Sequence, residues 1–127
     1  MQEVIESYTG EKPMILRFPG GTSNTVSKQY NKGIMTRLTE QLKELGFRYF
    51  DWNVDSRDAG GAKTAEAVLA NVINGIGDKE VAVVLQHDLY GFSVEAVEDI
   101  IVWGLNNGYT FAPLTEYSPA CEHEPNN

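Results

Sequence analysis

Apolar residues follow two kinds of spacing along the chain, and together these predict alternating strands and helices. Short apolar runs predict strands at residues 14–16, 48–54, 81–85 and 109–114. Helical spacing predicts helices at residues 33–45, 64–76 and 93–105, the last turns of another at 2–8, and a short helical turn within 26–32. Thr64 and Ser93 are placed to cap the two later helices.

The order of these elements predicts an α/β fold in which a parallel β-sheet alternates with helices. Strand–helix–strand units of this kind form parallel sheets with right-handed crossovers. Val81–Leu85 is apolar on both faces, as in a parallel strand that is covered on both sides. Because a closed barrel usually has about eight strands, the sequence predicts an open sheet or about half of a barrel.

The predicted domain occupies residues 1–117, and residues 118–127 form a polar tail. The tail contains two prolines and no apolar pattern, so we expect it to lack ordered structure. The helix at residues 2–8 begins in mid-pattern without an N-cap. We therefore expect the sequence to be a segment of a longer domain.

Composition and charge exclude several classes of partner. The chain has 127 residues, 42% of them hydrophobic and 22% charged, which is typical of a soluble domain. Its net charge is −8, and the Lys and Arg residues are scattered, so we expect neither nucleic acid nor an anionic membrane as a partner. The single cysteine excludes an internal disulfide. The N-terminal residues predict no signal peptide, and the compartment is not fixed by the sequence.

Polar clusters follow three of the predicted strands. They are Arg17–Gly21, Asp55–Asp58 and Leu85–Asp88. In α/β folds, chemistry is placed at the carboxyl ends of parallel strands. The clusters therefore indicate an enzyme scaffold, and their residue types suit an acyl-transfer site.

The first cluster can supply donors to an oxyanion. Pro19 stiffens the loop and Gly20 removes a side chain, so that backbone N–H groups can point into one cavity. Arg17 can hold a carboxylate in position. Alternatively, the loop is only a turn and Arg17 a surface residue. It is neither a Walker loop nor a dinucleotide-binding fingerprint.

The other clusters can supply an acid. His87 at a strand end can act as a general acid or base. Asp55 or Asp58 can hold its imidazole in one tautomer. Alternatively, His87 is a structural hydrogen-bonding residue and both aspartates belong to turns.

Taken together, the clusters resemble motifs of the NodB-like polysaccharide deacetylases, carbohydrate esterase family four. Arg17–Gly21 is similar to the family's Arg-x-Pro-x-Gly motif, Asp55–Ala59 to Asp-x-x-Asp-Trp, and Leu85–His87 to Leu-x-His. Tyr49–Ser56 and Gly108–Phe111 also resemble bacterial peptidoglycan deacetylases. The likeness extends to about Leu114, over what would be the C-terminal half of the family's barrel.

The resemblance implies a reaction and a role for each residue. The reaction is metal-assisted hydrolysis of N-acetyl groups on N-acetylglucosamine in peptidoglycan or a chitin-type polysaccharide. His87 would be the general acid, Asp58 its carboxylate partner with Asp55 as the alternative, and Arg17 the residue that orients the catalytic base. In the substrate pocket, Gly20 beside Pro19 would bind the oxyanion, and Leu85 would line the space for the acetyl methyl group.

The chain departs from the family in ways that bear on activity. It has neither the Thr-Phe-Asp-Asp motif, which would supply the base and a metal ligand, nor the metal-binding His-x-x-x-His motif. Ala59 stands where the family usually has tryptophan. We therefore expect no metal bound by this chain, a divalent metal such as zinc only in the complete family domain, and little activity from the chain alone. The tail residues Cys121–Glu124 could bind a metal but are expected to be solvated.

Other interpretations stay open at this stage. The chain could be a non-catalytic carbohydrate-binding or interaction module, with Tyr90, Phe92 and Tyr109 as stacking surfaces. It could also be an open α/β domain with a ligand at a switch point. In the half-barrel interpretation, the strand at residues 14–16 would have an open edge where the missing strands belong, which predicts self-association into a homo-oligomer.

Overall fold

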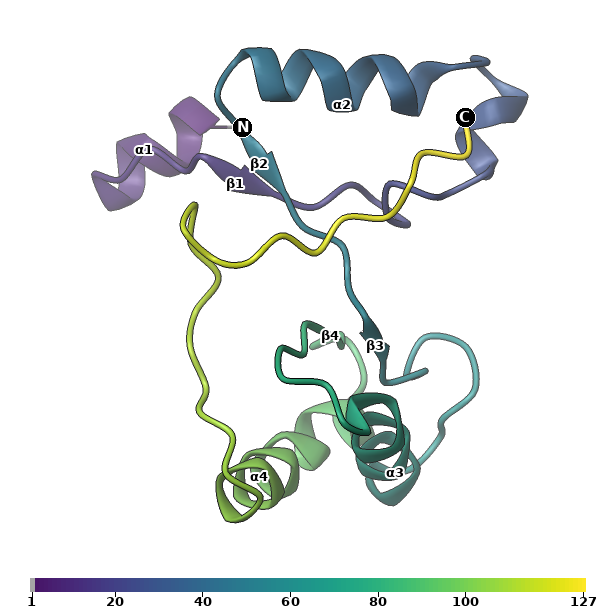
Figure 1. Ribbon diagram of the computed structural model, residues 1–127, viewed down its shortest axis with the longest axis vertical. Helices are drawn as coiled ribbons and strands as arrows, with labels where there is room; N and C mark the ends of the chain where they lie inside the picture. Colours follow the sequence, from purple (N-terminus) through teal and green to yellow (C-terminus); the bar gives the residue numbers. More distant parts are fainter. Residues whose placement is uncertain (1) are drawn as a thin grey trace. The chain divides into compact units, whose positions relative to one another are not determined.

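The structure, a computed structural model, describes residues 2–127. The chain divides into two compact units, each described here by itself. Unit 1 comprises Met1–Asp51 and Leu114–Asn127, and unit 2 comprises Trp52–Pro113. Each unit contains a two-stranded parallel sheet and its own helices (Figure 1). The α/β class predicted from the sequence is confirmed.

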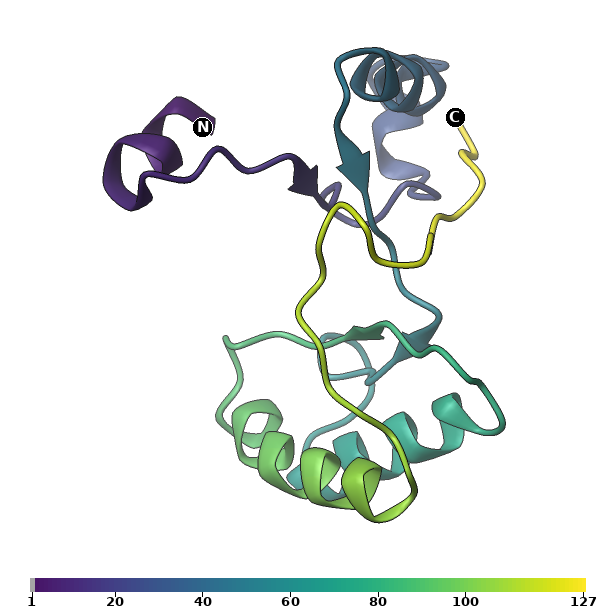
Figure 2. The ribbon, with the colours of Figure 1, turned by 60° about the vertical axis from the view of Figure 1, so that its left-hand side comes forward.

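Unit 1 is built around the strand pair β1 and β2. β1 (Ile15–Leu16) and β2 (Arg48–Tyr49) are parallel, with Ile15 opposite Arg48 and Leu16 opposite Tyr49. Between them the chain forms the 3-10 helix η1 (Val26–Gln29) and the helix α2 (Ile34–Glu44). The helix α1 (Gln2–Thr9) buries no residue and is joined to β1 by an extended stretch (Figure 2).

Unit 2 packs two helices beside one strand pair. β3 (Val54–Asp55) and β4 (Val84–Leu85) are parallel, and α3 (Ala65–Ile76) and α4 (Gly91–Asn106) lie side by side (Figure 1). α3 contacts both α4 and β3. The core of the unit contains Val54, Ala62, Val68, Val72, Ile76, Ala96 and Ile100. Because Val54 of β3 belongs to this core, the core holds β3 in place. The candidate site begins in the segment that follows β3.

The predicted strand at residues 48–54 is two strands, β2 and β3, separated by a break. A continuous strand with one face on the core would alternate its burial, but Tyr49, Phe50 and Asp51 are buried in succession. The backbone N–H of Asp51 donates to the carbonyl of Cys121 at 2.7 Å. The chain therefore leaves the β1 ladder at this point to pair with a distant segment.

The strand predicted at residues 109–114 is not present in the described part of the chain. Instead, the backbone N–H of Tyr109 donates to Gly104, and its hydroxyl donates to the carbonyl of Lys79 at 2.9 Å. The ring of Phe111 approaches Gly104 so closely that a Cβ there would lie 2.7 Å from it. The segment after α4 thus packs back on the helix rather than joining a sheet.

The two predicted helix caps had different outcomes. Thr64 caps α3 as expected, because its side chain accepts a hydrogen bond from the N–H of Ala67. Ser93 is not the cap of α4, which begins at Gly91 after Tyr90. The prediction was wrong because the Ser93 hydroxyl has a partner elsewhere in unit 2.

The tail is held against unit 1, contrary to the expectation that residues 118–127 lack ordered structure. Asn127 is buried, and its carbonyl accepts the N–H of Thr36 at 2.8 Å while its side chain accepts the N–H of Gly33 at 2.7 Å. The tail has no regular secondary structure. Backbone hydrogen bonds, which a composition argument does not detect, fix it in place. Among residues 2–127, no helix has the length and apolar character needed to cross a bilayer.

Candidate active site

The candidate site in unit 2 is centred on the buried carboxylate of Asp58, which is 1% exposed. Its Oδ2 accepts hydrogen bonds from the backbone N–H of His87 and from the Ser93 hydroxyl, both at 2.6 Å. Its Oδ1 lies 2.8 Å from Nδ1 of the His87 ring. One carboxylate therefore holds the end of β4, the imidazole ring and the first turn of α4.

The local fold explains how Asp58 reaches His87. In the parallel pair, Asp55 lies opposite Leu85, so the segments after β3 and β4 leave the sheet side by side. The Asp55 side chain accepts the N–H of Arg57 at 2.8 Å, and Arg57 has a left-handed backbone with φ 58°. This tight turn directs Asp58 inward. Asp55 itself is exposed and acts as the turn residue, and Leu85 is partly buried in β4.

A second set of contacts supports the turn. The Ser56 side chain is fully buried, and its hydroxyl lies 3.4 Å from the backbone nitrogen of Asp58. Asn71 of α3 donates its side-chain amide to the carbonyl of Ser56 at 3.0 Å. The side chain of Gln86 donates to the carbonyl of Ser93 at 2.6 Å. Both helices thus hold the ends of the strands that carry the site.

The hydrogen bonds keep Asp58 ionised despite its burial. Burial alone would raise the pKa of the Asp58 carboxyl, but hydrogen bonds from Ser93 and His87 outweigh it and lower the pKa to about 2. An ionised carboxylate can only accept, so Nδ1 of His87 carries the proton of their shared hydrogen bond. This leaves Nε2 as the ring nitrogen for a substrate. The His87 side chain is 27% exposed, and Tyr90 meets its ring edge-on at 6.5 Å.

The glycine loop of unit 1 contains the remaining predicted residues. Arg17 is exposed immediately after β1, and Pro19 and Gly20 are also exposed. Gly20 and Gly21 have φ values of 71° and 78°, a left-handed conformation that favours glycine. These residues belong to unit 1 and His87 to unit 2, and their roles toward His87 stay predictions.

Asp51 is a structural residue that the strand pattern did not reveal. It is 2% exposed, its Oδ1 accepts the N–H of Thr22 at 2.8 Å, and its Oδ2 accepts the N–H of His123 at 2.8 Å. It therefore ties the glycine loop to the tail. The only signal in the sequence was a charged residue between two aromatic residues, Phe50 and Trp52.

The tail cluster does not provide a set of metal ligands. Glu122 forms an ion pair with Lys43 at 2.9 Å, and Nδ1 of His123 lies 3.1 Å from the Ser23 hydroxyl. Burial raises the pKa of the Cys121 thiol, and the nearby charge of Asp51 adds to this. Within residues 2–127, no group of three or more His, Cys, Asp or Glu side chains is arranged to hold a metal ion.

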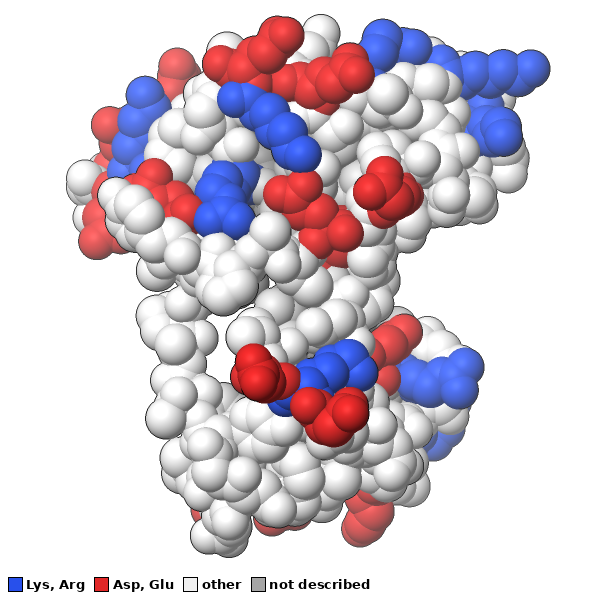
Figure 3. Space-filling model, viewed as in Figure 1, with Lys and Arg blue, Asp and Glu red and all other residues white. Residues whose placement is uncertain are grey.

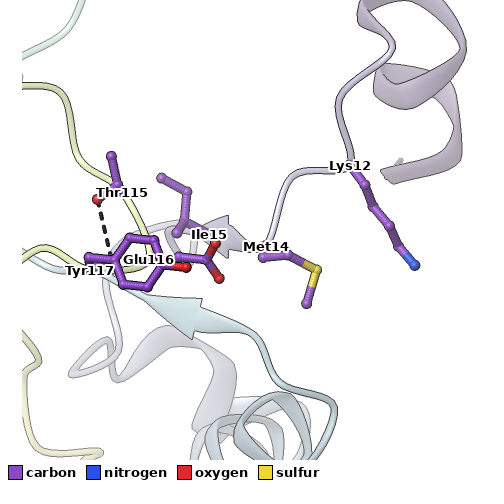
Figure 4. A pocket seen from close by; sticks show the side chains of 6 residues that line it. All are labelled: Lys12, Met14, Ile15, Thr115, Glu116 and Tyr117. Carbon is purple, nitrogen blue, oxygen red and sulfur yellow. Dashed lines mark hydrogen bonds between the residues drawn. The ribbon is translucent and has the colours of Figure 1, made fainter.

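A cavity of about 310 Å³ lies in unit 1, beside β1 and the start of the tail (Figure 4). It is lined by Lys12, Met14, Ile15, Thr115, Glu116 and Tyr117. None of these residues belongs to any of the three polar clusters. The cavity therefore adds no residue to the candidate site.

Comparison with known proteins finds similarity to polysaccharide deacetylases, and no sequence model of a protein family matches the chain. It is 30% identical over 126 residues to a peptidoglycan-N-acetylglucosamine deacetylase of Bacillus cereus, covering 92% of this chain and 41% of that protein. The crystal structure of the catalytic domain of peptidoglycan N-acetylglucosamine deacetylase from Eubacterium rectale matches all of this chain and 58% of its own, with 52% identity and a TM-score of 0.96.

A second solved structure is also similar to this chain. The polysaccharide deacetylase of Bacillus cereus is 28% identical, with a TM-score of 0.71 over 94% of this chain and 57% of its own. The chain thus spans less than two thirds of each of these relatives. The motif resemblance and the structural matches agree, and the chain is similar to part of the NodB-like polysaccharide deacetylase domains.

Proposed function

We propose that the domain to which this chain belongs hydrolyses N-acetyl groups of N-acetylglucosamine residues in peptidoglycan or a related chitin-type polysaccharide, and that this chain contributes the general acid. The observation that carries the proposal is the buried, ionised Asp58, which fixes His87 by its backbone and its ring. The names of the relatives, peptidoglycan N-acetylglucosamine deacetylases, support the choice of substrate.

In the proposed reaction, water attacks the carbonyl carbon of the acetyl group and gives one proton to the base, which lies outside this chain, while the carbonyl oxygen becomes an oxyanion. The C–N bond then breaks, and its electron pair goes to the amide nitrogen. The protonated His87 ring gives the proton on Nε2 to that nitrogen, so that a neutral amine leaves with acetate as the other product. Asp58 holds the ring through Nδ1, which leaves Nε2 to face the substrate in this proposal.

The other predicted residues have supporting roles in this proposal. The N–H of Gly20, presented by the stiff Pro19–Gly20 turn, stabilises the oxyanion. Arg17 orients the catalytic base, and Leu85 lines the space for the acetyl methyl group. Asp55 maintains the turn that delivers Asp58.

The described residues do not fit the divalent metal that the family implies, because residues 2–127 contain no suitable group of ligands. We assign no step of the reaction to a metal held by this chain. The base and the metal ligands are proposed to come from the part of the domain that the chain does not span. In this proposal the chain supplies the acid side of the reaction.

The isolated chain is expected to release no acetate from N-acetylglucosamine oligomers, even with added zinc or cobalt. It holds the acid but lacks a base to activate water, and loss of a catalytic group of this kind commonly costs about 10²- to 10⁴-fold in rate. Acetate release is measured over hours against the His87→Ala chain. Release well above that control would contradict the proposal.

A chimeric domain tests whether this chain supports acetate release when the rest of the domain is present. It joins this chain to the part of the Eubacterium rectale catalytic domain that the chain does not match, which the 52% identity and TM-score of 0.96 make feasible. The chimeric domain is expected to release acetate. A folded chimeric domain that does not do so would count against the proposed role of this chain.

A carbohydrate-binding role without catalysis is the second candidate, and one observation favours it. The rings of Tyr90 and Phe92 stack with centroids 5.4 Å apart, and Tyr90 is 37% exposed beside His87. Calorimetry of the chain with chitin or peptidoglycan fragments separates the two candidates. Binding by the isolated chain, combined with an inactive chimeric domain, would favour the binding role.

Self-association through β1 stays a proposal. Among residues 2–127, β1 pairs with β2 alone, so its other edge is not part of a sheet. Sedimentation of the chain at micromolar concentrations tests this proposal, and a monomer throughout would contradict it.

A further inference from the structure

Ser93 is a fully buried residue in the first turn of α4, and its side chain is directed to the candidate site. Its exposed fraction is 0%, and its hydroxyl donates a hydrogen bond to Oδ2 of Asp58 at 2.6 Å. A serine that caps a helix would instead accept a backbone N–H of that helix. The hydroxyl therefore serves the carboxylate of Asp58 rather than the end of α4.

The backbone of Ser93 is held on both sides. Its N–H donates to the carbonyl of Tyr90 at 2.9 Å, and its carbonyl accepts the side-chain amide of Gln86 at 2.6 Å. Gln86 directly precedes His87 in the chain. These contacts fix Ser93 independently of Asp58, so its hydroxyl is already in place to meet the carboxylate. Catalytic side chains are oriented well when the residues that support them are themselves fixed in this way.

The donors to Asp58 are not equivalent. Of the three hydrogen bonds described above for its carboxylate, two come from His87 itself, through the backbone N–H and the ring. Ser93 supplies the third and is the donor that does not belong to the histidine. It therefore fixes the carboxylate from outside the Asp58–His87 pair. A hydrogen bond to an ionised group is roughly twice as strong as one between neutral groups, so this contact can hold the carboxylate firmly.

The electrostatics of unit 2 support the importance of this contact. Burial raises the pKa of Asp58, and the Ser93 hydroxyl makes the largest contribution among the contacts that lower it to about 2. Of the groups that contribute, only His87 can itself carry charge, and the adjacent Arg57 and Asp88 are exposed. On the face of unit 2 drawn in Figure 3, acidic and basic side chains lie next to one another, with no extended region of one sign. The immediate partners of Asp58 therefore set its ionisation.

We propose that Ser93 is a positioning residue for the deacetylation reaction, whose hydroxyl holds the Asp58 carboxylate against the His87 ring and so keeps the imidazole oriented to protonate the departing amine. The inference rests on the proposed function, in which His87 is the general acid. Ser93 acts through Asp58 and is assigned no contact with the substrate. It extends the pair of Asp58 and His87 by a third member, as a base or acid in an active site is commonly oriented by a further group.

The first experiment measures kcat and KM of the chimeric domain on N-acetylglucosamine oligomers. Ser93→Ala is expected to lower kcat about tenfold with KM within about twofold, because a misoriented acid affects the transition state more than substrate binding. Ser93→Thr keeps a hydroxyl and should stay within about threefold of the parent kcat. Ile100→Val is the matched control, since Ile100 is also buried on α4 but belongs to the apolar core. Its kcat should stay within about twofold of the parent, although it also loses stability.

The second experiment needs no activity and uses the isolated chain. The ¹³Cγ NMR signal of Asp58 is followed from pH 6 to pH 3, because its position reports whether the carboxylate is ionised. The parent, Ser93→Thr and Ile100→Val should show little change over this range. In Ser93→Ala the measured pKa of Asp58 should rise from about 2 to between about 3 and 4, so that its signal moves within the range.

The outcomes separate the role of Ser93 from the proposed function. A parent chimeric domain that releases no acetate would contradict the proposed function. With an active parent, an unchanged kcat in Ser93→Ala, or equal falls in Ser93→Ala and Ile100→Val, would overturn the role of Ser93 alone. So would an Asp58 signal in Ser93→Ala that does not move down to pH 3, or a folded Ser93→Thr domain no more active than Ser93→Ala.

Circular dichroism checks the fold of each variant under the conditions of each experiment. Ser93→Cys has a similar shape and a weaker donor, so it replaces Ser93→Ala if the alanine variant does not fold. Its kcat is then expected to fall below that of the parent, whereas Ile100→Val does not. If Ser93→Thr does not fold, the comparison of Ser93→Ala with Ile100→Val decides.

Discussion

His87→Ala in the chimeric domain is expected to lower the rate of acetate release from N-acetylglucosamine oligomers by about 10²- to 10⁴-fold, the usual contribution of a general acid. Without the ring, the departing nitrogen must leave as an unprotonated amide anion or take its proton from water. The effect should fall on kcat more than on KM, because proton transfer occurs only in the transition state.

Asp88→Asn is the matched control for this loss. Asp88 is adjacent to His87 in the chain and exposed, and it contributes no contact to the Asp58 cluster. We expect its kcat to stay within about twofold of the parent domain, as for most exposed substitutions. An equal fall in kcat for both variants would contradict the specific role of His87.

Asp58→Ala is expected to lower the free energy of unfolding of the chain by about 3 kcal/mol. The substitution leaves the Ser93 hydroxyl, the His87 backbone N–H and the His87 ring without their shared acceptor. Each of these donors sits in a buried or partly buried place where an unmade hydrogen bond is costly. Urea denaturation of the parent chain and the variant measures the difference. A loss below about 1 kcal/mol would contradict this account of the cluster.

The same contacts predict a pH dependence. The pKa of Asp58 is lowered from 3.8 to about 2 in the folded chain, so the unfolded chain binds this proton more readily. The contribution of Asp58 is therefore fully present above about pH 5 and is lost as the pH falls toward 2, a change of about 2 kcal/mol. Asp58→Asn, which cannot ionise, should lack this component. Parallel stability curves for the parent and Asp58→Asn from pH 5 to pH 2 would contradict it.

The sequence predicted the parts of the fold that depend on local pattern. The apolar periodicity of α2, α3 and α4 and the cap at Thr64 are encoded within a few residues, and these elements are confirmed. Ser93 was misplaced because a serine near a helix start is typical of a cap, whereas its partner Asp58 lies 35 residues away in sequence. Local pattern carries no information on a contact at that separation.

The candidate site also depends on contacts between residues far apart in sequence, which local pattern does not predict. The polar clusters at strand ends were visible, but the choice between Asp55 and Asp58 as the neighbour of His87 depends on a turn at Arg57 and on strand register. Asp51 and the tail were missed for a related reason. The Asp51 carboxylate accepts hydrogen bonds from backbone N–H groups about 30 and 70 residues away in sequence. The pattern of side chains along the sequence does not predict contacts with backbone groups.

The general-acid role of His87 is tested most directly by changing the leaving group in the chimeric domain. An aryl acetate ester releases a stable phenolate and needs no proton, whereas the N-acetyl amide needs one. The His87→Ala domain should therefore have a kcat about a hundredfold or more lower on the sugar amide. On 4-nitrophenyl acetate its kcat should fall only a few fold. Equal losses on the two substrates would show that the imidazole does not protonate the departing amine, and the assignment of this chain as the acid-bearing part of a deacetylase would fail.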